Sequence, residues 1–239
     1  MSSSFSKRLI REIKEYETQR KQLSEQGIHF EYDHNDLRNI KLLIIGPSDT
    51  PYYGGFYFFK IFVSDQYPLV PPKVEFVTKY NSIRFHPNLY VDGKVCLSIL
   101  GTWTGPIWTP CMTITTIALT IQSIMTDNPL THEPAYYEAS AETTECKNYK
   151  EIVTYANLIG GVIHMIQNIP IGFNNFQKII NNYFITHFKN YVINQENDGK
   201  TFTSNYGMSC NLDYTTVQKE FDSMLSILEK EKEKETEKE

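Results

Sequence analysis

One thiol and one carboxamide stand eight residues apart in the stretch HPNLYVDGKVCLSIL, which covers residues 86–100. Asp92 and Gly93, between them, have the form of a tight two-residue hairpin turn. Such a turn brings the chain after Asn88 back past the chain before Cys96. A carboxamide N–H beside a thioester can stabilise the oxyanion that forms when an amine attacks it. The spacing therefore indicates a cysteine that carries an acyl group.

No residue adjacent in sequence is a base that would take the proton from Cys96. A thiol that receives an already activated acyl group needs no strongly lowered pKa, because cysteine is nucleophilic even near its ordinary pKa. The pattern therefore suits acyl acceptance better than hydrolysis. An alternative stays open on these residues alone, in which His-Pro-Asn is only a turn and Cys96 is a buried core residue.

The composition limits the class of protein. The 239 residues are 41% hydrophobic and 13% aromatic, which is enough for a sizeable core. A net charge of −5 argues against a nucleic-acid-binding protein. Residues 97–126 carry no charge, but glycines and prolines interrupt them, and the apolar part after Pro110 is shorter than the roughly 20 residues that span a bilayer. The polar start MSSS has no hydrophobic signal core, so we expect no secretion and no membrane contact.

The cysteines do not form a recognisable metal or disulfide pattern. The four residues share no CxxC spacing and no paired histidines, so we expect no metal site and no disulfide framework. Each is expected to be a reduced thiol; the four are Cys96, Cys111, Cys146 and Cys210.

The first half of the chain reads as a helix followed by strands. Apolar residues recur at helical spacing over 5–26, and Gly27 supplies a stop. The three prolines of 67–72 exclude that segment from a central strand. Three runs have the aromatic and β-branched composition of strands and predict an antiparallel meander with short turns; they are 40–45, 53–63 and 73–78.

The second half reads as helical. The last helix has Thr215 and Gln218 at the spacing of a capping box. Residues 229–239, EKEKEKETEKE, have no apolar side chain and predict a solvated, fraying helix end or disorder. The predicted helices are 113–125, 136–151, 152–167, 174–192 and 215–228.

Taken together and in order, five segments resemble the ubiquitin-conjugating enzyme family. A Gly-Gly pair, YPxxPP, HPN and a cysteine eight residues after the asparagine form a specific combination, which covers about residues 5–150. The resemblance implies an α+β conjugating domain over 1–150, with an N-terminal helix, a four-stranded antiparallel meander and then helices, and a helical C-terminal extension over 151–239. The segments are KRLIREI (7–13), GPSDTPYYGGFYFFKIFV (46–63), YPLVPPKVEF (67–76), HPNLYVDGKVCLSIL (86–100) and IWTP (107–110).

The resemblance also assigns roles around the thiol. It makes Cys96 the thioester cysteine, which requires a sulfur that solvent can reach. Asn88 stabilises the oxyanion, holds the loop beside the thiol, or does both. His86 and Pro87 shape the loop.

Two departures from the common family pattern stand out. The loop GTWTGPIWTP (101–110) is about four residues longer than usual, and it resembles the Z-type subgroup, which carries a C-terminal helical extension and is charged by an alternative activating enzyme. The acidic residue that family members place beside the thiol falls on Thr131 or His132 in DNPLTHEP (127–134). His132 could act as a general base near neutral pH; alternatively, it is a solvated loop residue.

Partner surfaces follow from the same resemblance. Lys7 and Arg8 match the basic start of the first helix, which family members offer to the activating enzyme, although a solvated helix face is an equal alternative. Leu69 and Pro110 would form an apolar patch for a RING-type ligase.

The resemblance implies a cytoplasmic enzyme, with the nucleus as a further location. It would take ubiquitin or a ubiquitin-like protein from an activating enzyme onto Cys96 and transfer it to a substrate lysine, usually with a ubiquitin ligase. The chain itself needs no cofactor, because ATP and magnesium serve the activating enzyme and no GxxxxGK[ST] loop is present. The rivals are a non-catalytic ubiquitin-binding adaptor of the same fold and a cysteine hydrolase.

Overall fold

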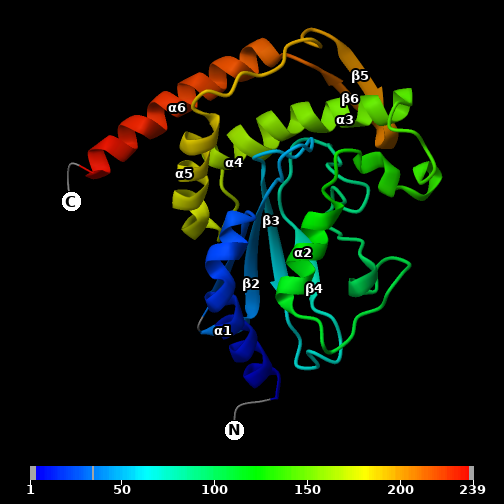
Figure 1. Ribbon diagram of the computed structural model, residues 1–239, viewed down its shortest axis with the longest axis vertical. Helices are drawn as coiled ribbons and strands as arrows, with labels where there is room; N and C mark the ends of the chain where they lie inside the picture. Colours follow the sequence, from blue (N-terminus) through cyan, green and yellow to red (C-terminus); the bar gives the residue numbers. More distant parts are fainter. Residues whose placement is uncertain (1–3, 34, 237–239) are drawn as a thin grey trace.

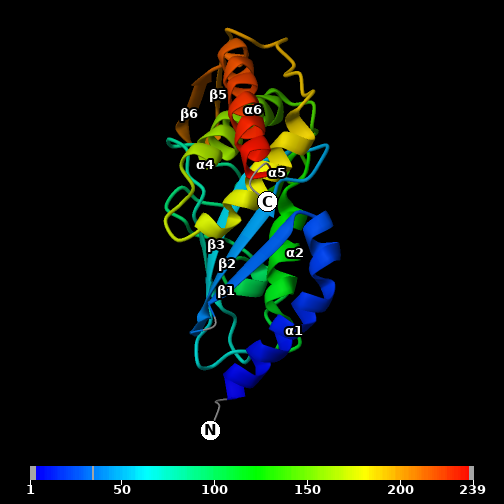
Figure 2. The ribbon, with the colours of Figure 1, turned by 90° about the vertical axis from the view of Figure 1, so that its left-hand side faces the viewer.

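The computed structural model describes residues 4–33 and 35–236 as a sheet with helices packed on one face and further helices across one end (Figures 1 and 2). Its helices are α1 (Ser4–Glu25), α2 (Ile114–Ile124), α3 (Thr144–Ala156), α4 (His164–Gln167), α5 (Gln177–Phe188) and α6 (Tyr214–Thr236), with a π-helical segment over Asn157–Ile163. Its strands are β1 (Ile28–Asp33), β2 (Asp36–Ile45), β3 (Phe56–Phe62), β4 (Lys73–Phe76), β5 (Thr201–Ser204) and β6 (Met208–Asn211). No helix in these ranges has the length and apolarity to cross a bilayer.

The four-stranded sheet confirms the predicted meander. Its order is β1-β2-β3-β4, every neighbouring pair is antiparallel, and Leu42 of β2 lies opposite Phe59 of β3. Side chains alternate between the two faces, as the pleat requires. Leu42 and Phe59 therefore belong to an inner cluster with α1 and α2, whereas Leu43 and Phe58 belong to an outer cluster with the C-terminal helices.

The first helix buries the stripe that its sequence predicts, with Leu9, Tyr16 and Leu23 at 5% exposure or less. A carboxylate is buried with them, which the pattern did not indicate. Glu12 is 5% exposed and accepts hydrogen bonds from the Tyr67 hydroxyl (2.6 Å) and the N–H of Ile114 (2.9 Å). A buried carboxylate needs such donors, so Glu12 ties α1 to the start of α2.

Two predicted helices, 136–151 and 152–167, have the wrong boundaries. Tyr136 ends a short 3-10 helix, residues 137–143 are not helical, and the Thr143 side chain caps α3 by accepting a bond from the Cys146 N–H. From Thr144 the chain stays helical through α3, the π-helical segment and α4. Gly160, in the wide turn, lies against Tyr80, where a Cβ would be 2.3 Å from the ring. The expected domain limit at 150/151 lies inside α3.

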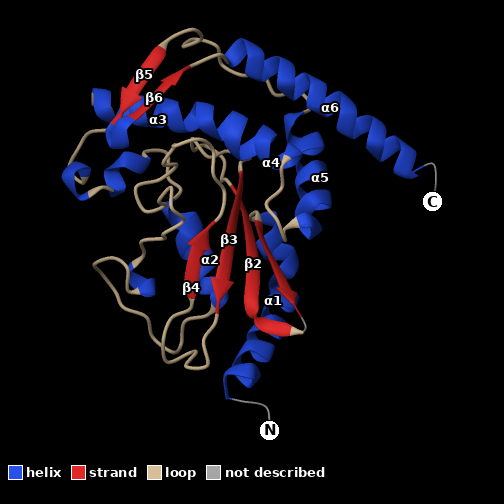
Figure 3. Ribbon diagram, turned by 180° about the vertical axis from the view of Figure 1, so that it is seen from behind, coloured by secondary structure: helices blue, strands red, loops and turns tan. Residues whose placement is uncertain are grey.

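The segment between the last two helices holds an unpredicted hairpin. Strands β5 and β6 pair antiparallel, and in Figures 1 and 3 the hairpin lies over α3 at the same end of the molecule. Each strand is four residues long and largely polar, so no apolar run marks it. The alternation at Thr201-Phe202-Thr203 and the Tyr206-Gly207 turn are the signals that could have found it.

The final helix was predicted correctly in place but not in its cap. The Thr216 N–H donates to the Asp213 side chain (2.8 Å), and the Tyr214 N–H donates to Asp198 (2.6 Å). The expected capping box is therefore wrong: Gln218 instead accepts a bond from the Ile193 N–H (2.9 Å). The helix continues to Thr236 through the charged run; residues 237–239 lie outside the described ranges.

Candidate active site

The chain around the thiol turns back on itself as expected, with one difference in the turn. The Tyr90 N–H donates to the Lys94 carbonyl (2.9 Å), and Leu89 bridges Val95. The loop therefore has three residues, 91–93, and the predicted two-residue turn is wrong by one. The return still brings the Cys96 N–H to the Asn88 carbonyl, at 2.9 Å.

The carboxamide of Asn88 holds this turn together from the other side. Its Nδ2 donates to the Cys96 carbonyl at 2.8 Å, and the side chain is 5% exposed. One of the two Nδ2 protons makes this bond, so a second remains for another acceptor. The Asn88 Oδ1 is buried without a hydrogen-bond partner. In this conformation the side chain holds the loop, and it keeps one N–H that an oxyanion could use.

The thiol itself is covered, contrary to the expectation of a sulfur open to solvent. Cys96 is 1% exposed, whereas Cys111 is exposed. The long loop begins by binding both neighbours of Cys96: the Thr102 hydroxyl donates to the Val95 carbonyl (2.7 Å) and accepts from the Leu97 N–H (3.0 Å). These bonds hold the beginning of the inserted loop against the cysteine segment.

His86 lies inside the loop that holds Asn88. It is 0% exposed, and its Nδ1 accepts the Asn88 N–H at 3.0 Å. The ring of His132 packs on it, with centroids 4.9 Å apart. Burial lowers the pKa of both histidines, and the neighbouring His132 lowers that of His86 further. Both imidazoles are therefore neutral near pH 7.

His132 is a loop residue with partners of its own. Its Nε2 lies 3.2 Å from the Thr126 hydroxyl, and the structure places its ring against His86. The following residue, Glu133, accepts a hydrogen bond from the Tyr206 hydroxyl at 2.5 Å. The acidic group of this loop thus contacts the C-terminal hairpin, a contact that no local sequence pattern predicts.

The two basic residues at the start of α1, Lys7 and Arg8, differ in their surroundings. Lys7 is exposed. Arg8 donates to Glu12 (2.5 Å) and to the Met112 carbonyl (2.9 Å). Burial lowers the pKa of Arg8, but the hydrogen bond and the charge of Glu12 outweigh it, so the net shift is upward. Arg8 therefore joins α1 to the chain before α2, and Lys7 is the cation that faces solvent.

Both residues of the predicted apolar patch are exposed, and so is one further apolar residue of the long loop. Leu69 is 76% exposed, and Pro110 is also exposed. The Trp108 indole N–H donates to the Pro68 carbonyl at 2.7 Å, which holds the two loops together. Ile107, next to that tryptophan, is 75% exposed and was not singled out from the sequence.

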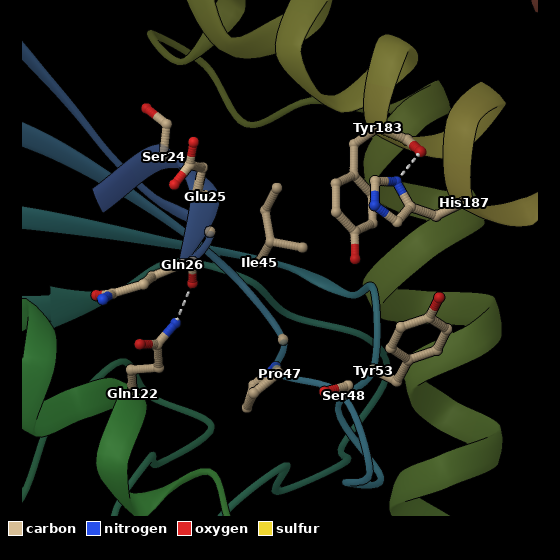
Figure 4. Close-up of a pocket in the computed structure, with 12 residues that line it drawn as sticks. Ser24, Glu25, Gln26, Ile45, Pro47, Ser48, Tyr53, Gln122, Tyr183 and His187 are labelled. Carbon is tan, nitrogen blue, oxygen red and sulfur yellow. Dashed lines mark hydrogen bonds between the residues drawn. The ribbon is translucent and has the colours of Figure 1, made fainter. Parts of the chain in front are cut away.

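A cavity of about 760 Å³ lies elsewhere, between the end of α1, the turn after β2 and α5 (Figure 4). Gln122 donates to the Gln26 carbonyl at one side (2.6 Å), and the Tyr183 and His187 rings stack at the other, 3.8 Å apart. None of the site residues predicted from the sequence lines this cavity.

Comparisons with known proteins point to one family. The family model described as "Ubiquitin-conjugating enzyme" matches residues 8–157. The chain is 44% identical over 136 residues to a protein from Danio rerio named ubiquitin-conjugating enzyme E2 Z, covering 56% of this chain and 41% of that protein. It is 33% identical over 176 residues to a human protein named dual E2 ubiquitin-conjugating enzyme/E3 ubiquitin-protein ligase BIRC6, covering 70% of this chain and 4% of that protein.

Among solved structures, human ubiquitin-conjugating enzyme E2 G1 is 34% identical with a TM-score of 0.42, covering 53% of this chain and 98% of that one. The chain spans less than half the length of the two sequence relatives.

Proposed function

Because this chain belongs to the ubiquitin-conjugating enzyme family, we propose that it carries ubiquitin or a ubiquitin-like protein as a thioester on Cys96 and transfers it to a substrate lysine. The observation that carries this proposal is the pair of hydrogen bonds between Asn88 and Cys96, at 2.9 and 2.8 Å. They support the proposal because the backbone and the carboxamide of Asn88 both bond to the backbone of the one cysteine that the family pattern requires.

The reaction is two acyl exchanges at one sulfur. First, the Cys96 thiolate attacks the carbonyl carbon of the thioester on the activating enzyme; the new C–S bond forms, the old one breaks, and the activating-enzyme cysteine leaves as a thiolate. Second, an unprotonated lysine amine attacks the Cys96 thioester. The C–N bond forms, the C–S bond breaks, the nitrogen proton passes to water, and Cys96 leaves as a thiolate. A ligase cysteine could take the acyl group in the same way.

Asn88 supports the second step. Attack by the amine puts negative charge on the former carbonyl oxygen, and a preorganised N–H donor near that oxygen lowers the barrier. Removing one such donor typically costs roughly a hundredfold or more in rate. The second Nδ2 proton of Asn88 is the donor that this chain offers.

The proposed reaction requires that a thioester can reach the sulfur of Cys96. With Cys96 at 1% exposure, the loop held by Thr102 must open before a bulky thioester can approach. Thr102→Val removes the hydroxyl bonds to Val95 and Leu97, so we expect it to speed the alkylation of Cys96 in the free protein.

Partner contacts follow from what is exposed. We assign the activating enzyme to the exposed start of α1 at Lys7, and a ligase to the apolar patch of Leu69, Ile107 and Pro110. ATP and magnesium are used by the activating enzyme, and the proposal gives this chain no cofactor.

The test is a charging assay. The purified chain is incubated with each ubiquitin-activating enzyme, ATP, magnesium and ubiquitin, or with a panel of ubiquitin-like proteins, and then run on a gel without reductant. We expect an adduct that a thiol reductant removes. Cys96→Ala should abolish it, and the matched control Cys111→Ala should keep it.

One observation favours a second candidate, a ubiquitin-binding adaptor of the same fold: the covered state of Cys96. An adaptor would bind ubiquitin but form no adduct with any activating enzyme and modifier. An adduct lost in Cys111→Ala but kept in Cys96→Ala would also overturn the proposal. Release of free ubiquitin from conjugates would instead indicate a hydrolase.

A further inference from the structure

The guanidinium of Arg84 lies between two tyrosine rings that come from distant parts of the chain. Its central carbon is 3.6 Å from the centroid of Tyr90, in the turn beside the thiol, and 4.1 Å from that of Tyr206, at the tip of the β5–β6 hairpin. The same guanidinium donates to the carbonyl of Pro87, in the loop that holds Asn88. One cation thus joins the C-terminal hairpin to the active-site turn.

The hairpin tip also contacts the second loop of the site. Tyr206 donates its hydroxyl proton to Glu133 at 2.5 Å, and Asn205 donates to the Tyr136 hydroxyl at 3.0 Å. Glu133 follows His132, whose ring packs on His86. The two loops around Cys96 are therefore held from outside by the same few residues of the hairpin. Figures 1 and 3 show the hairpin reaching past α3 to this end of the molecule.

The backbone of Tyr206 is in an unfavourable conformation for its residue type. Its φ and ψ are 62° and 21°, in the left-handed region that glycine and asparagine adopt more easily. Such a conformation is strained for a bulky residue and persists where surrounding contacts impose it. Here the contacts are the stack on Arg84, the edge-to-face contact with the Tyr149 ring and the bond to Glu133. The position thus carries a tyrosine where the turn alone would favour glycine or asparagine.

We propose that Tyr206 is a positioning residue for acyl transfer, which holds the His86–Asn88 loop through Arg84 and the His132 loop through Glu133. The inference rests on the proposed function for its catalytic part: the C-terminal segment, which lies outside the matched residues 8–157, completes the active site. Tyr206 itself touches no reacting atom. It acts by keeping the Pro87 carbonyl, and with it the Asn88 donor, in place.

The experiment compares the full chain with three variants. Tyr206→Asn removes the ring but suits the left-handed turn, so the hairpin should fold. Tyr206→Phe keeps the stack on Arg84 and loses the bond to Glu133. Tyr191→Asn is the matched control, because Tyr191 packs on Phe188 and Phe221 in the same C-terminal segment.

Two readouts are used. The first is hydrogen exchange at the Leu89 and Cys96 amides, which bond to His86 and Asn88. We expect Tyr206→Asn to lower the protection of these amides about tenfold, because the variant loses one cation–π contact and one charge-assisted hydrogen bond. The second is the discharge of preformed thioester to free lysine. Its saturating rate should fall about tenfold with unchanged half-saturating lysine concentration, and Tyr206→Phe should restore most of it.

The outcomes separate the two ideas. If the unmodified chain forms no thioester, the proposed function fails, and the exchange readout alone decides whether Tyr206 positions the loop. Unchanged protection in Tyr206→Asn overturns the inference whatever the charging result. Equal losses of discharge in Tyr206→Asn and Tyr191→Asn also overturn it, because the effect would then be general destabilisation.

Discussion

The C-terminal segment contacts the rest of the molecule in two places of opposite character. At the outer face of the sheet the contact is apolar. The ring centroid of Phe58, in β3, lies 5.0 Å from that of Phe173 and 6.1 Å from that of Phe176, and all three rings are buried. We call this the outer-face contact. At the hairpin tip the contact is polar and half exposed, made by Arg84, Tyr206 and Glu133. We call this the hairpin-tip contact.

The difference teaches what each contact can do. A fully buried aromatic side chain contributes roughly 1.5–3 kcal/mol through removal from water, and it needs little directional accuracy. A partly exposed cation–π contact contributes about 0.5–1 kcal/mol but fixes the position of a planar charge. The outer-face contact therefore holds the segment to the sheet, and the hairpin-tip contact sets the geometry beside the thiol.

The largest effect should come from breaking the outer-face contact. Phe58→Ala leaves a cavity among Phe173 and Phe176 and should lower the free energy of unfolding by about 3–5 kcal/mol. Urea denaturation followed by circular dichroism measures it. Phe62→Ala, in the same strand but 41% exposed, is the control and should change stability much less. Equal losses in the two variants would show that the outer-face contact is not the main attachment.

A buried hydrogen-bond pair joins β3 to Asn157, the last matched residue, just before the C-terminal segment begins, and should give the next largest effect. The Tyr57 hydroxyl donates to the Asn157 side chain at 2.5 Å, and Asn157 donates to the Tyr53 carbonyl at 2.9 Å. Asn157→Ala leaves the hydroxyl of Tyr57, which is 0% exposed, without its acceptor and should lower the free energy of unfolding by about 2 kcal/mol.

Adding Tyr57→Phe to Asn157→Ala removes that orphaned hydroxyl. The double variant should therefore lose less than the sum of the two single variants in the same denaturation experiment. Simple additivity would mean that the two side chains do not act as a pair.

The core was predictable because its signals are local. Local patterns predict which residues are buried; they are the stripe of Leu9, Tyr16 and Leu23 and the aromatic run of 56–62. The helix over 113–125 was found for the same reason, and its cap at Thr113 lies next to it in sequence. The spacing of Asn88 and Cys96 likewise predicted that the two residues meet.

What escaped prediction depends on partners far away in sequence. The sequence alone suggests that Glu12 is exposed to solvent, because its hydrogen-bond donors, Tyr67 and Ile114, are far away in the chain. Asp198 caps α6 from about 16 residues away, which no local capping rule detects. The burial of Cys96 and the contact of Tyr206 with Glu133 arise from loops that fold onto one another.

The free energy of unfolding should decrease in acid, with a slope to which the buried His86 contributes. Burial, with His132 next to it, lowers the pKa of His86, so the folded state leaves that imidazole neutral while the unfolded chain binds a proton below about pH 6.5. The unfolded state then binds more protons, so stability falls as the pH drops below about 6.5, by about 1.4 kcal/mol per pH unit for each such histidine.

His86→Asn tests this slope, because asparagine can still accept the Asn88 N–H but does not titrate. Urea unfolding between pH 5 and 6.5 should show a slope smaller by about one proton. His29, whose pKa burial lowers to about 4, remains in both proteins and contributes equally. An unchanged slope would mean that His86 does not lose its proton on folding.

The smallest effect, and the one that separates the two contacts most sharply, is the coupling between Arg84 and Tyr206. A double-mutant cycle of Arg84→Met and Tyr206→Asn should give a coupling of about 0.5–1 kcal/mol in the free energy of unfolding. Arg84→Met keeps the apolar stem and removes the charge, so the coupling reports the stacked cation. The same cycle in 1 M salt should give nearly the same coupling, because the charge and the rings are in direct contact, with centroids 3.6 and 4.1 Å from the central carbon of the guanidinium. A coupling of several kcal/mol would make the hairpin tip an anchor equal to the outer face, and no coupling would leave Tyr206 as a surface ring.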